Sequence, residues 1–209
     1  MKKFIMITPL QGYDKDGQDA LKPTLYKAPG NSRLEYKKET RFPLIPLING
    51  YAEEGEEIRV FAITPETEHT PRHVKQLSEE LSALQEKKGF KCKGVEVIPV
   101  LYAGDVRNQI DIFHKVINKL EDNDRLYGCI TFGNKPMPIA EIMAIEYAYR
   151  VLENVTIGCL IYGEKNHTTN EAIIFDITAM IQLNEITSIL AEKRVKDPKR
   201  IMDLIIDGE

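Results

Sequence analysis

Residues 126–137, LYGCITFGNKPM, pass from a short apolar run through a glycine-containing turn into a helical pattern. The run Leu126–Phe132 is short and bulky, which is typical of a strand that is buried on both faces. Pro136 and Pro138 favour a helix start, and an apolar helical pattern continues over Ile139–Leu152. A buried strand followed by a buried helix is the repeating unit of an α/β protein with a parallel sheet.

The same alternation extends along most of the chain. Helical patterns open at Thr70-Pro71, where threonine is the expected N-cap, and at Asp105. A proline-interrupted helix is expected over Phe42–Tyr51. The other expected strands are Phe4–Ile7, Ile58–Ile63, Val95–Tyr102, Val155–Tyr162 and Ala172–Ile177. We therefore predict an α/β fold with a Rossmann-like, mainly parallel six-stranded sheet and helices on both faces.

Two regions depart from this alternation. Residues 9–40 follow the first strand without a helical period, and a connection of that length is usually functional or mobile. After the sixth strand, helices are expected over Thr178–Lys193 and from Asp197-Pro198 onward. We predict one domain over residues 1–177 and a C-terminal helical extension over residues 178–209, which packs on that domain or leads to a further one.

Composition and charge exclude several classes of protein. With 43% hydrophobic residues and a net charge of −4, the chain is neither disordered nor suited to a broad electrostatic grip on duplex nucleic acid. Cys92, Cys129 and Cys159 lie far apart, which argues against a secreted disulfide scaffold. No run approaches the ~20 apolar residues of a membrane span. We expect a cytoplasmic protein whose partners include neither duplex nucleic acid nor a membrane.

In open parallel sheets, ligands bind beyond the carboxyl ends of the strands. After the first strand, Thr8-Pro9-Leu10-Gln11-Gly12 offers a hydroxyl and backbone N–H groups, although a plain exit turn fits the spacing equally well. The chain has no G-x-G-x-x-G fingerprint and no Walker lysine here, which argues against the common nucleotide cofactors. We expect no cofactor.

The loop that begins at Thr131 is the strongest candidate for an anion site. Gly133-Asn134 allows a tight turn, Lys135 supplies a cation, and Pro136 begins a helix whose free N–H groups favour anions. The alternative interpretation is a helix start whose lysine only points to water.

Other polar side chains carry weaker signals. His69 and His73 lie four residues apart, but no third ligand is evident, so we expect surface histidines and no metal. Glu141 and Glu146 do not share a helix face well, so we expect each of them at an interface or in solvent.

The segment Ile130–Met137 resembles the D-x-T-G-G-T-K-P-M loop of CARF domains, the CRISPR-associated Rossmann fold. The glycine- and tyrosine-containing excursion leading to Thr40–Leu47 is similar to that family, as is Ala172–Thr178 before the long helix. The likeness extends over essentially the whole chain, and it departs from the family pattern at Phe132 and Asn134.

The resemblance implies a homodimer with a two-fold pocket for cyclic oligoadenylates, the second messengers of type III CRISPR antiviral defence. Rings of four or six adenylates have symmetry that matches such a dimer. Phosphates would meet Lys135 and the backbone N–H groups of residues 133–137. The expected ligand-binding residues are Thr8, Pro9, Leu10, Gln11, Tyr102, Gly104, Arg107, Asn108, Thr131, Phe132, Gly133, Asn134, Lys135, Pro136 and Met137.

Two functions stay open under this resemblance. The chain is a sensor, either alone or fused to an effector in a longer protein, or it is a stand-alone ring nuclease. Ring opening needs no metal if the ribose 2′-OH attacks the adjacent phosphate, with Lys135 stabilising charge and Thr8 positioning the phosphate. The products would be linear, with 2′,3′-cyclic phosphate ends. A transcriptional regulator would need a winged helix, for which residues 178–209 are too few.

Overall fold

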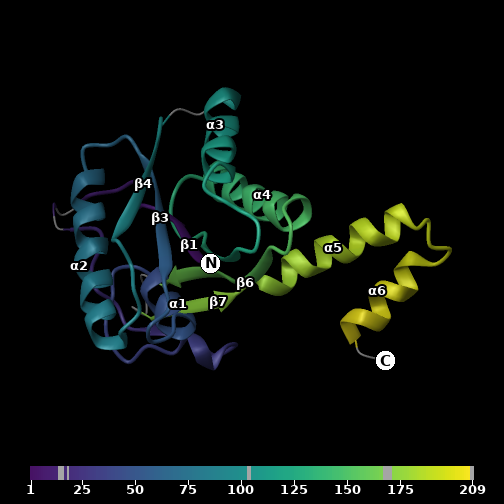
Figure 1. Ribbon diagram of the computed structural model, residues 1–209, viewed down its shortest axis with the longest axis horizontal. Helices are drawn as coiled ribbons and strands as arrows, with labels where there is room; N and C mark the ends of the chain where they lie inside the picture. The colour runs from purple at the N-terminus through teal and green to yellow at the C-terminus, as the bar shows by residue number, and fades with distance from the viewer. Residues whose placement is uncertain (14–16, 18, 103–104, 167–170, 208–209) are drawn as a thin grey trace. The chain divides into compact units, whose positions relative to one another are not determined.

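The computed structural model describes residues 1–13, 17, 19–102, 105–166 and 171–207 (Figure 1). The chain divides into two compact units, Met1–Ile177 and Thr178–Glu209.

The larger unit is built on one sheet with the strand order β2-β7-β6-β5-β1-β3-β4. Its strands are β1 (Lys2–Ile7), β2 (Tyr26–Lys27), β3 (Ile58–Pro65), β4 (Val95–Val100), β5 (Arg125–Cys129), β6 (Thr156–Lys165) and β7 (Ala172–Asp176). All neighbours pair in parallel except β6 and β7, which are antiparallel. The prediction of an α/β fold with a mainly parallel sheet is confirmed.

The predicted number of strands is wrong, because the described residues form a sheet of seven strands. The additional strand, β2, lies inside the excursion that follows β1 and pairs with Ala172 and Ile173 of β7. Two residues are too few to show the alternation by which a strand is recognised in a sequence, so β2 left no signal.

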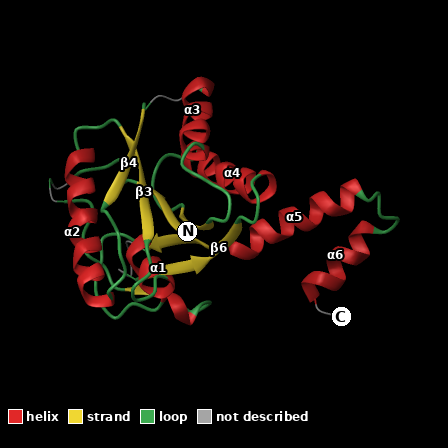
Figure 2. Ribbon diagram, viewed as in Figure 1, coloured by secondary structure: helices red, strands yellow, loops and turns green. Residues whose placement is uncertain are grey.

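Helices cover both faces of the sheet (Figures 1 and 2). They are η1 (Ser32–Leu34), α1 (Leu44–Tyr51), α2 (Thr70–Lys88), α3 (Val106–Ile117) and α4 (Pro136–Val151). Phe4 and Met6 of β1 belong to the core cluster that includes the buried leucines of α1 and α2. On the other face, a Cβ at Gly128 of β5 would lie 2.9 Å from the Ile145 Cδ1 atom of α4, so the absence of a side chain there lets the helix pack closely.

The helix starts differ in how they are capped. α3 opens at Asp105 as predicted, and the Asp105 side chain caps it by accepting a hydrogen bond of 2.9 Å from the Asn108 N–H. Thr70 is not the cap of α2: His69 precedes the helix without a side-chain cap, and the Thr70 hydroxyl donates to the Pro65 carbonyl.

The second unit consists of α5 (Thr178–Glu192) and α6 (Pro198–Asp207), neither of which has a buried residue. Among the helices of the described residues, none combines the length and apolar character needed to cross a membrane.

Candidate functional site

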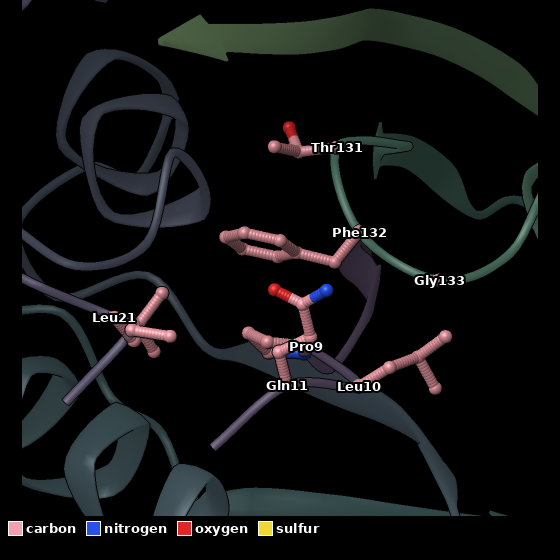
Figure 3. A pocket seen from close by; sticks show the side chains of 8 residues that line it. Pro9, Leu10, Gln11, Leu21, Thr131, Phe132 and Gly133 are labelled. Carbon is pink, nitrogen blue, oxygen red and sulfur yellow. The ribbon is translucent and has the colours of Figure 1, made fainter. Parts of the chain in front are cut away.

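The loops after β1 and β5 leave the sheet toward opposite faces. β1 and β5 are neighbours; after β1 the chain passes through β2 and η1 before it reaches α1 on one face, and after β5 it enters α4 on the other. Such a switch point opens a crevice at the carboxyl edge of a parallel sheet. A cavity of about 260 Å³ lies there (Figure 3). It is lined by Pro9, Leu10, Gln11, Ala20, Leu21, Thr131, Phe132 and Gly133.

The structure therefore brings together the two loops that the sequence indicated. Phe132 and Leu21 reach into the cavity from opposite sides in Figure 3. Ala20 and Leu21 also line the pocket, although the sequence did not indicate them. The signal for them was weak, since the length of the connection after the first strand was the only indication that it serves a site.

Thr131 and Phe132 are held in place by residues that do not line the cavity. The Thr131 Oγ1 atom accepts a hydrogen bond of 2.8 Å from the Gly163 N–H, which ties the end of β5 to β6. The Phe132 ring packs edge-on against Phe42, with ring centroids 6.5 Å apart. The aromatic side of the pocket is thus supported by packing before any ligand binds.

Gly133 is required by the turn after β5. Its φ of +94° lies in the left-handed region, and a Cβ there would come within 2.9 Å of the Ile7 Cγ2 atom. The sequence-based interpretation of this glycine as a tight turn agrees with both observations. Asn134 next to it does not have a positive φ.

Lys135 and Pro136 do not line this pocket. They line a separate groove of about 560 Å³ between α3 and α4, and the Lys135 side chain is exposed. The remaining residues of the groove are Val106, Gln109, Ile110, Phe113, Ile139, Ala140 and Met143. Among the described residues, no charged side chain lines the pocket between the β1 and β5 loops.

Other expected ligand-binding residues lie elsewhere. Thr8 is fully buried, with its hydroxyl 3.4 Å from the Ile63 carbonyl, and Met137 is 3% exposed in the core. Tyr102 and Arg107 are exposed near the start of α3 and do not line the pocket. Asn108 is half-buried at the same helix start. Gly104, which was also expected at the site, lies outside the described residues.

His73 is buried, contrary to the expectation that it lies on the surface. It is 0% exposed, and its Nδ1–H donates to the Pro9 carbonyl at 3.1 Å. Burial, and then the Arg72 charge, lower the pKa of the imidazole, so that it stays neutral. The available signal was its spacing, because His73 lies four residues before Leu77 in the apolar stripe of α2.

Glu141 is also buried, where an interface or solvent was expected. It is 0% exposed, and burial raises the pKa of its carboxyl well above the usual 4.5. Glu141 lies four residues after Met137 and three before Ala144, both of which are buried. This spacing places Glu141 on the inner face of α4, so its burial could have been predicted from the sequence. Glu146 is half-buried.

In the described part of the chain, no three His, Cys, Asp or Glu residues lie together as a possible set of metal ligands. No protein-family model matches the chain, and no curated protein matches it. The fold and the site define a class: an α/β protein with a pocket at the switch point of a mainly parallel sheet.

Proposed function

We propose that this protein binds a cyclic oligoadenylate, with four or six units, as a sensor in type III CRISPR antiviral defence. The observation that carries the proposal is the pocket at the switch point, whose lining combines the Gln11 amide with the Phe132 ring. An amide both donates and accepts hydrogen bonds, and an aromatic ring stacks on a base. A neutral lining of this kind suits an adenine better than a phosphate.

The size of the pocket supports a site that is shared between two chains. Its volume of about 260 Å³ is below the roughly 300–1,000 Å³ of most small-molecule sites. A ring of four or six adenylates is larger than this, so one chain takes only part of it. A second copy related by a two-fold axis would take the matching part.

The groove between α3 and α4 is the surface that we propose for the homodimer contact. Val106, Ile110, Ile139 and Met143 are each more than half exposed there. Contiguous exposed patches of large apolar residues mark interaction sites in soluble proteins. Lys135 lines this groove at the start of the 16-residue helix α4, so a dimer would bring two such cations and two helix N-termini to the phosphates of one ring.

Geometry favours binding over cleavage of the ring. Thr8, which would position the phosphate in a ring nuclease, has its side chain buried inside the fold. We therefore propose a sensor and let the same experiment measure cleavage.

The test is to titrate the protein with cyclic tri-, tetra- and hexa-adenylate without added metal, and to follow heat and product mass. We expect one tetra- or hexa-adenylate ring per two chains and an intact ligand. Phe132→Ala and Gln11→Ala should weaken binding about tenfold or more, as expected for loss of a base-stacking or hydrogen-bonding group. Lys87→Ala, on the exposed last turn of α2, is the control.

Failure to bind any of the three rings would show that the proposal is wrong. Linear products with 2′,3′-cyclic phosphate ends would show that the ring nuclease is the correct function.

A further inference from the structure

The excursion that follows β1 closes on itself next to the pocket. The Ala20 N–H donates to the Gly12 carbonyl at 3.2 Å, and Tyr13 forms an antiparallel bridge with Asp19. We call residues 12–13 and 19–20, which this pairing joins, the base of the excursion. Gln11 and Leu21, which adjoin the base in sequence, both line the pocket. The position of the base therefore determines the shape of one pocket wall.

The first turns of α2 hold this base. One Arg72 guanidinium nitrogen donates to the Gly12 carbonyl and lies 3.5 Å from an Asp19 carboxylate oxygen. The same guanidinium lies 4.6 Å from the centre of the Tyr13 ring. Gln76, one turn later on the same face, donates to the other Asp19 oxygen at 3.0 Å. Both segments of the base, residues 12–13 and Asp19, are thus bound by side chains of α2.

His73 binds the residues that precede the base, through a hydrogen bond to Pro9. Among the described residues, the only hydrogen-bond partner of its side chain is the carbonyl of Pro9, which lines the pocket, and its Nε2 atom is buried without a partner. A buried carbonyl needs a donor, because leaving it unpaired is costly. An apolar side chain of similar size at position 73 would fill the same space but would donate no hydrogen bond to the Pro9 carbonyl.

Within the described residues, neither Arg72 nor His73 lines the pocket, so neither contacts a group that is bound inside it. We propose that Arg72 and His73 are positioning residues for this site: they hold Pro9, Gly12 and Asp19 in the arrangement that binds the ligand. This inference rests on the proposed function, because the ligand whose affinity they control is the cyclic oligoadenylate.

The first experiment compares ligand affinities. His73→Asn keeps a donor near the position of Nδ1, whereas His73→Leu fills the space without a donor. With cyclic tetra- and hexa-adenylate, we expect Arg72→Ala and His73→Leu to weaken binding about tenfold and His73→Asn less than about threefold. If His73 only filled space in the core, the apolar variant His73→Leu would bind the ligand more tightly than His73→Asn. Lys75→Ala, an exposed position on the same helix, is the control.

The second experiment needs no ligand. Amide hydrogen exchange should become faster at Gln11, Gly12 and Leu21 in Arg72→Ala and His73→Leu, with no change in β3. Arg72→Lys, which keeps the charge but not the planar fork, replaces Arg72→Ala if that variant does not fold.

The two failures are distinguishable. If the wild-type protein binds a ring and both variants bind it equally well, the positioning inference is wrong and the proposed function stands. If the wild-type protein binds no ring, the proposed function is wrong and the exchange rates decide the positioning role. Unchanged rates at the three amides would then overturn it.

Discussion

Glu141 stands where α4 packs against β5, in a place that suits a neutral side chain. Its Oε1 atom lies 3.3 Å from the position that a Cβ of Gly128 would occupy, so the glycine makes room for the carboxyl. Burial raises the pKa of Glu141 well above the usual 4.5, and the nearby Cys129 backbone opposes this only in part. The folded protein therefore holds the Glu141 proton to a higher pH than the unfolded chain does.

This predicts the pH dependence of stability at the residue scale. Because the folded pKa is the higher one, the contribution of Glu141 to stability is complete below about pH 4.5 and is lost as pH rises toward the folded pKa, by up to about 1.4 kcal/mol per pH unit. Glu141→Gln removes this loss, so we expect its unfolding free energy to match the wild type near pH 4.5 and exceed it at pH 7.5. Urea unfolding at several pH values measures the difference. A difference that does not change with pH would contradict the prediction.

At the scale of the element, α4 shows two apolar surfaces with different neighbours. Ala140, Ala144 and Ala148 are buried at four-residue spacing along one side of the helix. Ile139 and Met143 are exposed on another side of the same helix. In a single chain the surface with Ile139 and Met143 is therefore left open to solvent.

We predict that this open surface of α4 carries the homodimer. Ile139→Glu and Met143→Glu should each weaken dimerisation by at least about 100-fold, because the two-fold axis places each charge in the contact twice. Analytical ultracentrifugation measures the dissociation constant. Tyr149→Glu, which is 40% exposed and lies on another side of the helix, should have no effect. A wild-type protein that is monomeric at all accessible concentrations would contradict the prediction.

At the scale of the whole molecule, the larger unit contains the main core by itself. The core cluster extends from Phe4 to Ile174, and no residue of α5 or α6 is buried. The free energy of folding should therefore arise almost entirely in the unit Met1–Ile177.

A chain that ends at Ile177 should fold on its own. We expect a cooperative urea transition whose unfolding free energy lies within about 1 kcal/mol of the full chain, because surface changes away from a core have small effects. Circular dichroism should show a loss of helix that corresponds to α5 and α6 alone. A truncated chain with no cooperative transition would show that the two units depend on each other for stability.

Most strands and helices of the larger unit could be predicted, because their periodicity is strong. The strand expected over Ile58–Ile63 extends to Pro65, and the expected helix that opens at Thr70 ends at Lys88. The strand β2 could not be predicted, since its two residues are held by pairing with β7 and not by a local pattern.

By itself, the sequence determined the alternation of strands and helices and the edge of the sheet at which a site belongs. Only the tertiary structure decided that Leu21 joins Gln11 and Phe132 in one pocket, and that Lys135 lines a different groove. The physical reason is that secondary structure depends on residues that are close in sequence, whereas a pocket depends on residues that are far apart in it. Periodicity and turn chemistry are properties of neighbours in the chain, whereas the residues that meet at a pocket are set by the packing of segments that are distant in sequence.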